Sequence, residues 1–352
     1  MTKPVRVRPE IRALKAYTPG VEEPFEVRAK LDFNESPDDV PEEIRAEVLE
    51  RLKARRWGHY PEFGAPRLKK AIAESIGRSP EEIVVGNGSG ETILAAVSVF
   101  AGGGSLVLAP PTFSLYGQIA AIASAKIVAV SRTGADFAVD EAGFLAAAAD
   151  GVPLLCSPNN PTGGVSGLAF VEKLLDAAAV VLLDQAYVEF AGAEDDFTRL
   201  VGSRPNVVVF RTLSKAYAAA GFRIGYAVAP PDLAREIDKA VLPFNVDLAA
   251  EELALALLAR PGSARARVAR VVDERERVAG ALRRTGHAVA SSSANFLFVK
   301  PRGGDAARVR RALLERGVLV RDMTAAAEGR LRVTIGSPAE NDLFLGALQE
   351  VS

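Results

Sequence analysis

The chain has 352 residues, more than one ordinary hydrophobic core accommodates, so two domains are expected, although a single large α/β unit is possible. Hydrophobic residues make up 49% and the formal net charge is −1, so the composition is globular and gives no reason to expect binding to nucleic acid or to a membrane surface. The single cysteine, Cys156, excludes an internal disulfide and favours a cytoplasmic location. One cysteine and two histidines also argue against a His/Cys metal site.

Residues 1–30 carry proline and charge with little periodicity, and we expect them to form an N-terminal arm. Beyond the arm, short continuous apolar runs alternate with amphipathic stretches such as 90–100, 114–124 and 166–178. Continuous apolar runs are typical of strands that are buried on both faces. The predicted strands are 82–86, 105–110, 125–130, 152–157, 180–184, 206–211 and 224–229. This pattern predicts an α/β fold with a mainly parallel, seven-stranded sheet covered by helices.

The pattern changes at about residue 247, where an Ala/Leu/Arg/Glu-rich helical stretch begins and runs to about 285. The segments that follow are predicted to be strands at 295–300, 317–322 and 330–336, a helix near 304–316 and a final helix. We therefore predict a large domain over 31–246 and a smaller α+β domain over 247–352. Residues 31–50 are expected to pack with the small domain or with the large one.

Polar and aromatic side chains follow the predicted strands of the large domain, at the edge where parallel sheets bind their ligands. Asp184 ends one strand, and Tyr187 comes three residues later. The turn "CSPNNPTGG" supplies Asn160, and "PPTFSLY" supplies Phe113. Two further segments, "GNGSGE" and "RTLSKAYAAAGFR", supply the remaining candidates, which are Gly88, Ser89, Gly90, Thr212, Ser214, Lys215 and Arg223.

These residue types predict a pocket for pyridoxal 5'-phosphate. A lysine can bond covalently to an aldehyde, and a buried carboxylate can keep a pyridine nitrogen protonated. Asn160 and Tyr187 can donate hydrogen bonds to the phenolic oxygen of the ring, and Phe113 can stack on its face. A glycine-rich turn at a helix N-terminus, hydroxyl groups and an arginine can hold the phosphate. Lys215 can then move protons, provided that its pKa falls well below about 10.4.

On these motifs the chain resembles the fold-type-I pyridoxal-phosphate aminotransferases and, within them, the histidinol-phosphate aminotransferases. The resemblance covers nearly the whole chain, from "LDFNESP" (31–37) and "YPEFG" (60–64) to "GRLRVTIGS" (329–337). Its most specific parts are "NNPTG" and "SKAYAAAGFRIGY", which occur in that order. Three features depart from the pattern. Gly90 stands where an acidic residue is frequent, Gln185 stands where glutamate is frequent, and "LDFNESP" is a variant of a looser motif.

The resemblance implies a role for each candidate. Lys215, Asp184 and Tyr187 would be catalytic, and Asn160, Phe113 and the phosphate-end residues would hold the cofactor. Tyr60 would reach the cofactor phosphate of a neighbouring subunit, so the enzyme would be a homodimer with shared active sites, and the arm would lie across the partner. The implied substrate-binding residues are Arg332, which would grip a carboxylate, and Arg321, Tyr17, Asn34 and Glu35.

The implied reaction is a ping-pong transamination in histidine biosynthesis. L-Histidinol phosphate and 2-oxoglutarate would give imidazole acetol phosphate and L-glutamate. An aromatic amino-acid aminotransferase and a threonine-phosphate decarboxylase stay open as alternatives on the same scaffold, because the sequence alone does not separate them. A non-catalytic pyridoxal-phosphate regulatory module is disfavoured by the intact Lys215 and Asp184 and by the short segment before residue 31.

Overall fold

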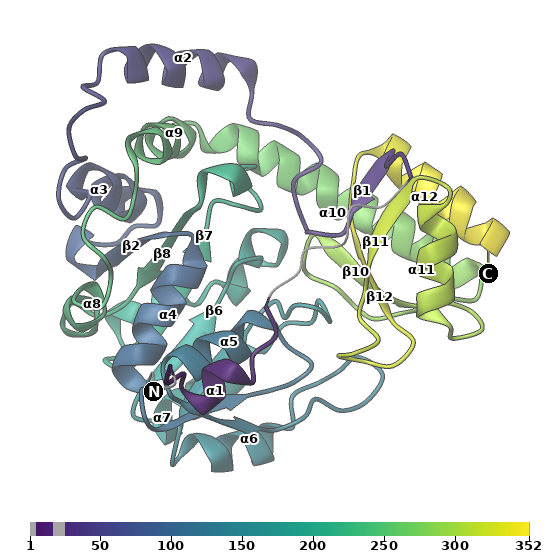
Figure 1. Cartoon of the computed structure of the whole chain (residues 1–352), viewed down its shortest axis with the longest axis horizontal. Coiled ribbons are helices and arrows are strands. Elements are labelled where there is room, and N and C mark those ends of the chain that lie inside the picture. The colour runs from purple at the N-terminus through teal and green to yellow at the C-terminus, as the bar shows by residue number, and fades with distance from the viewer. Residues whose placement is uncertain (1–4, 17–24, 352) are drawn as a thin grey trace.

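The computed structural model describes residues 5–16 and 25–351, which form a large and a small unit side by side (Figure 1). The large unit contains a seven-stranded sheet and the small unit a five-stranded sheet. The long helix α10 (Pro261–Arg284) runs from one unit to the other (Figure 1). Within these two described ranges, no helix combines the length and the apolar character that a membrane crossing requires.

The large sheet has the strand order β2-β8-β7-β6-β5-β3-β4. All neighbouring pairs from β7 to β4 are parallel, whereas β8 runs antiparallel to both β2 and β7. The predicted α/β fold with a mainly parallel seven-stranded sheet is confirmed. The strands are β2 (Ile83–Asn87), β3 (Ser105–Leu108), β4 (Lys126–Ala129), β5 (Val152–Cys156), β6 (Val181–Asp184), β7 (Val207–Thr212) and β8 (Ile224–Val228).

Two hydrophobic clusters cover the two faces of this sheet, because successive side chains of a strand point to opposite sides. In β6, Val181 and Leu183 belong to one cluster and Leu182 to the other. One face is covered by α4 (Ser89–Phe100), α5 (Leu115–Ile122) and α8 (Pro231–Asp238). The other is covered by α3 (Pro66–Ser75), α6 (Glu141–Ala148), α7 (Leu168–Ala177) and α9 (Leu248–Leu258).

The small sheet has the strand order β1-β11-β12-β10-β9 and packs on α10, α11 (Ala306–Leu314) and α12 (Pro338–Val351). Its strands are β1 (Ala29–Leu31), β9 (Ala288–Val289), β10 (Phe296–Lys300), β11 (Val318–Asp322) and β12 (Leu331–Thr334). We did not predict β1 and β9, because runs of three and two residues leave no recognisable apolar pattern. Short 3₁₀ helices complete the chain at Pro80–Glu82, Val188–Phe190, Ala193–Asp195, Phe197–Gly202 and Ala220–Phe222.

The division between the two units differs from the predicted boundary at residue 247. Helix α9 buries Leu253 and Leu257 in the core of the large unit, against α3 and α2 (Glu42–Lys53). Along α10, the first residue buried in the core of the small unit is Val271. Strand β1 pairs in parallel with β11, so the chain contributes a strand to the small unit before it enters the large one.

The described part of the arm contains α1 (Pro9–Arg12), which lies against α5 of its own chain. The Arg8 guanidinium donates to Ser124 Oγ (2.6 Å) and to the carbonyl oxygen of Ile122 (3.0 Å). The predicted position of the arm across a partner subunit stays a prediction.

Candidate active site

A cavity of about 710 Å³ lies between the two units, at the carboxyl ends of β5, β6 and β7. The parallel register places Cys156 beside Asp184, and Asp184 beside Phe210, so the turns after these strands open at one edge of the sheet. Most of the predicted site residues line this cavity: Asn34, Glu35, Ser89, Gly90, Phe113, Asn160, Asp184, Tyr187, Thr212, Ser214, Lys215, Arg223, Arg321 and Arg332.

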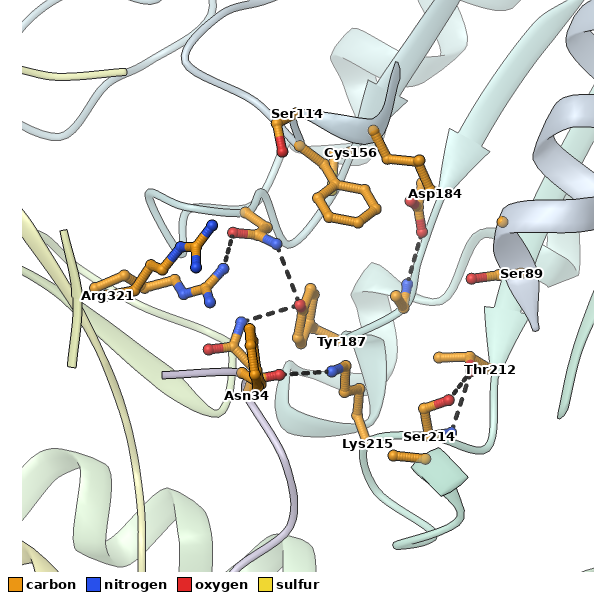
Figure 2. A pocket seen from close by; sticks show the side chains of 18 of the residues that line it. Asn34, Ser89, Ser114, Cys156, Asp184, Tyr187, Thr212, Ser214, Lys215 and Arg321 are labelled. Atoms are coloured by element: carbon orange, nitrogen blue, oxygen red, sulfur yellow. Dashed lines mark hydrogen bonds between the residues drawn. The ribbon is translucent and has the colours of Figure 1, made fainter. Parts of the chain in front are cut away.

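Lys215 lies in the middle of this cavity, and its Nζ atom donates to the carbonyl oxygen of Phe33 (3.1 Å; Figure 2). Burial lowers the pKa of Lys215 to about 7, and the positive charges of Arg332, Arg223 and Lys30 lower it as well. The amine is therefore largely neutral at slightly alkaline pH, where it can act as a nucleophile and as a base. The two largest causes, burial and Arg332, became evident only in the fold.

The Asp184 carboxylate is buried and held by two neutral donors. The backbone N–H of Ala186 donates to Oδ1 (3.1 Å), and the Tyr116 hydroxyl donates to Oδ2 (2.5 Å). Burial raises the pKa of Asp184, while these two hydrogen bonds oppose the rise. We did not predict that Tyr116 would donate to Asp184. The sequence feature that could have indicated it is the position of Tyr116 three residues after Phe113.

Two amide groups converge on the hydroxyl of Tyr187 (Figure 2). Asn34 Nδ2 donates to Tyr187 Oη at 3.0 Å, and Asn160 Nδ2 donates to it at 3.4 Å. The Asn160 Oδ1 atom in turn accepts a hydrogen bond from Arg332 Nη1 (2.8 Å). Burial raises the pKa of Tyr187 to about 12, although Arg332 and the Asn34 amide lower it. The hydroxyl is therefore protonated at neutral pH.

One end of the cavity is built to hold an anion. Helix α4 begins there with Gly88 at its N-cap, and its first backbone N–H groups and dipole favour negative charge. A Cβ atom on Gly88 would lie 2.6 Å from Arg223 Nη2, so the guanidinium of Arg223 lies directly against this turn. A Cβ atom on Gly225 in β8 would lie 2.0 Å from the Ser89 nitrogen, so only glycine lets β8 pass beneath the turn. Thr212 and Ser214 add hydroxyl groups.

The opposite end of the cavity carries two guanidinium groups. Arg321 in β11 and Arg332 in β12 are register partners, which places both on one side of the small sheet. Arg332 is buried and donates to the carbonyl oxygen of Asp32, while Arg321 lies 6.0 Å from the ring centre of Phe33. The Glu35 carboxylate lies nearby and accepts a hydrogen bond from Lys30.

Among the described residues, two predicted ones do not line this cavity. Gly88 lies just behind it at the N-cap of α4. Tyr60 is 80% exposed and stacks on Phe244, with the ring centres 4.6 Å apart. Tyr17 lies outside the described residues.

The residues present fit pyridoxal phosphate. A protonated ring nitrogen would give the buried Asp184 a charge-assisted partner, which its two neutral donors do not supply. The anion-binding turn at α4 suits the phosphate, and the low pKa of Lys215 suits covalent bonding to an aldehyde.

Comparison with known proteins agrees with this site. The family model described as "Aminotransferase class I and II" matches residues 28–348, so the chain belongs to this family of pyridoxal-phosphate-dependent enzymes, as the motifs predicted. Within it, the chain is 38% identical over 345 residues to the histidinol-phosphate aminotransferase of Thermococcus kodakarensis, covering 98% of each protein. The predicted resemblance to the histidinol-phosphate aminotransferases is confirmed.

Two further relatives extend this comparison. The crystal structure of histidinol-phosphate aminotransferase from Sinorhizobium meliloti in complex with pyridoxal-5'-phosphate is 26% identical, with a TM-score of 0.85. The comparison covers 98% of this chain and 97% of that one. An aromatic amino acid aminotransferase of Mycobacteroides abscessus is 37% identical over 351 residues, covering 97% of this chain and 98% of that protein.

Proposed function

We propose that this enzyme transfers the amino group of L-histidinol phosphate to 2-oxoglutarate, giving imidazole acetol phosphate and L-glutamate in histidine biosynthesis. The observation that carries the proposal is the pair of guanidinium groups, Arg321 and Arg332, fixed on one side of the cavity. One site must accept a phosphate in one half-reaction and a carboxylate in the other, and arginine binds both groups in a planar, two-pronged geometry. The names of the 38% and 26% identical relatives support the same donor. We also infer that the enzyme works in the cytoplasm, since its one cysteine is buried and free.

Each cavity residue takes a role in this proposal. Pyridoxal phosphate supplies an aldehyde for the amino group and a ring that withdraws electrons from the neighbouring carbon. Asp184 would hold a proton on the ring nitrogen, and the neutral amine of Lys215 would take up the α-proton of the substrate and later donate a proton back. Asn160 and Tyr187 hold the phenolic oxygen. The remaining contacts are Phe113 on the ring face and Gly88, Ser89, Gly90, Thr212, Ser214 and Arg223 at the phosphate.

The substrate contacts come from both ends of the chain. Arg332 is buried beside Lys215 and is suited to the carboxylate of glutamate and 2-oxoglutarate. Arg321 lines the same end of the cavity and is suited to the phosphate of the donor. Glu35 also lines the cavity, where its carboxylate can meet the imidazole of histidinol phosphate. Tyr17 stays a predicted substrate contact.

A half-reaction without 2-oxoglutarate tests the choice of donor. We expect L-histidinol phosphate to convert the bound cofactor to its amine form at least about tenfold faster than phenylalanine, since a lost phosphate contact costs more than about 1.4 kcal/mol. Absorbance in a stopped-flow instrument measures both rates, with threonine phosphate and carbon dioxide release followed in parallel. Faster conversion by phenylalanine would assign the enzyme to aromatic transamination, which the M. abscessus relative favours as the second candidate.

We further propose a homodimer, because the structure exposes a cluster of large apolar side chains on one surface. Trp57, Tyr60, Phe63, Leu242 and Phe244 are between 40% and 80% exposed, and three of their rings contact one another. Exposed patches of this kind mark protein interfaces. A second copy that covers this patch would bring Tyr60 toward the phosphate end of the neighbouring cavity.

Two variants separate the dimer from the shared site. Tyr60→Phe keeps the ring and should leave a dimer by sedimentation, while it raises the dissociation constant of pyridoxal phosphate about tenfold through loss of one hydrogen bond to a charged group. Phe244→Asp should shift the protein toward monomer. Monomeric wild-type protein, or unchanged cofactor binding by Tyr60→Phe, would contradict the shared site.

A further inference from the structure

Asn34 uses all of its polar groups on other parts of the protein. Its backbone N–H donates to Thr334 Oγ1 (2.9 Å), and its carbonyl oxygen accepts from Asn295 Nδ2 (3.0 Å). Its Oδ1 atom accepts from the Thr334 hydroxyl (3.1 Å), and its Nδ2 group donates to Tyr187 Oη (3.0 Å). The residue is 1% exposed. We predicted Asn34 as a substrate contact, but each of its polar groups already has a partner within the protein.

The backbone of Asn34 is held in a conformation that few residues adopt. Its φ of +54° lies in the left-handed region, which asparagine tolerates better than most side chains other than glycine. The groups that hold it there belong to the small unit, because Thr334 ends β12 and Asn295 immediately precedes β10. The small sheet therefore determines where the Asn34 amide points.

The hydroxyl of Tyr187 can accept hydrogen bonds through its oxygen and has one proton to donate. The Asn34 and Asn160 amides both donate to that oxygen, so the Tyr187 proton cannot be used toward either amide nitrogen. The hydroxyl proton is then left to point into the cavity, toward the position proposed for the phenolic oxygen of the cofactor. The Asn34 contact is the shorter of the two, and shorter hydrogen bonds of this type are stronger.

We propose that Asn34 is a positioning residue, which turns the Tyr187 hydroxyl toward the cofactor and couples that hydroxyl to the sheet of the small unit. The inference rests on the role proposed above for Tyr187, but not on the identity of the amino donor. Nothing in Asn34 needs to touch the substrate. Its effect should therefore be visible in the bound cofactor before any substrate is added.

Two substitutions of Asn34 probe its contact with Tyr187, and they differ in what they change in the backbone and in the side chain. Asn34→Gly removes the amide and keeps a residue for which a φ of +54° is unstrained. Asn34→Asp keeps the size of the side chain and an oxygen for Thr334, but it replaces the donating NH₂ group with an acceptor. The Tyr187 proton would then turn toward the introduced carboxylate, away from the cavity. Asn206→Gly is the matched control, because its amide donates to the carbonyl oxygens of Leu175 and Ala178, outside the lining of the cavity.

The measurement is a pH titration of the absorbance of the bound cofactor, without substrate. A hydrogen bond donated to the phenolic oxygen stabilises its negative charge when the neighbouring proton leaves, so weakening that bond raises the midpoint. We expect Asn34→Gly to raise the midpoint by about half a pH unit and Asn34→Asp by about one unit, the shift expected for one hydrogen bond to a charged group. Asn206→Gly should leave it unchanged.

A double-mutant cycle with Tyr187→Phe completes the test. If Asn34 acts through the Tyr187 hydroxyl, Asn34→Gly should produce no further shift once that hydroxyl is absent. An unchanged midpoint in both Asn34 variants, or the same shift with and without the hydroxyl, overturns the proposal. A raised KM for the amino donor with an unchanged midpoint would return Asn34 to the substrate contacts. Because the titration contains no donor, its result stands whether or not histidinol phosphate is the substrate.

Discussion

Replacing Lys215 with alanine is expected to lower the turnover number by at least about 1000-fold, because one side chain supplies both the nucleophile and the general acid–base, and the latter alone contributes about 100- to 10,000-fold. The measurement is steady-state turnover with saturating amino donor, 2-oxoglutarate and added pyridoxal phosphate. Lys215→Arg is the companion variant, because its guanidinium group stays positively charged and cannot become neutral near pH 7, so its turnover should also be low. Turnover of the alanine variant within about tenfold of the wild type would show that another group moves the proton.

The low pKa of Lys215 adds a pH dependence to this prediction. Covalent uptake of pyridoxal phosphate by the cofactor-free protein should rise with pH up to about 7 and level off above it, since the neutral amine is the reacting form. A folded-state pKa below the unfolded value means that the unfolded chain binds more protons, so stability falls as pH decreases from about 10.5 to about 7. Lys215→Ala should remove this pH-dependent loss of stability. Uptake of pyridoxal phosphate that keeps rising toward pH 10 would mean that the pKa of the Lys215 amine is not lowered.

Replacing Asp184 with asparagine is expected to lower turnover by about 100- to 1000-fold, the usual effect of removing one fixed electrostatic partner from a transition state. The asparagine keeps the size of the side chain and still accepts from Ala186, but it cannot hold a proton on a ring nitrogen. Tyr116→Phe is the companion variant, because it removes one hydrogen bond and leaves the carboxylate in place. We expect it to lower turnover by only about tenfold.

Asp184→Asn should stabilise the cofactor-free protein, although it lowers turnover. Burial raises the pKa of Asp184, so its ionisation costs stability as pH rises from the unfolded value of about 3.8 through the higher folded value. Asp184→Asn removes that cost and should raise the melting temperature of the cofactor-free protein at neutral pH. Differential scanning calorimetry measures the change. Near-native turnover together with an unchanged melting temperature would contradict the buried, ionised carboxylate.

Much of this molecule follows from local sequence. Each apolar run of the large unit is long enough to specify its own strand, and the residue that ends the run is thereby placed at the carboxyl edge of the sheet. Asp184, Asn160 and Lys215 could be assigned to one pocket for this reason alone. The glycine-rich turn before α4 likewise identified the anion-binding end of the cavity.

The sequence by itself therefore determined the large sheet, the cofactor and the residues that follow its strands, since those features depend on the period and the ends of single elements. Only the tertiary structure decided that β1 joins β11, that α9 belongs to the large core, and that Tyr116 donates to Asp184. It also decided that Asn34, which lies at the cavity, is hydrogen-bonded to Thr334, a residue 300 positions away in the chain. Contacts between such distant residues arise when whole elements pack together, and no local pattern records which elements these will be.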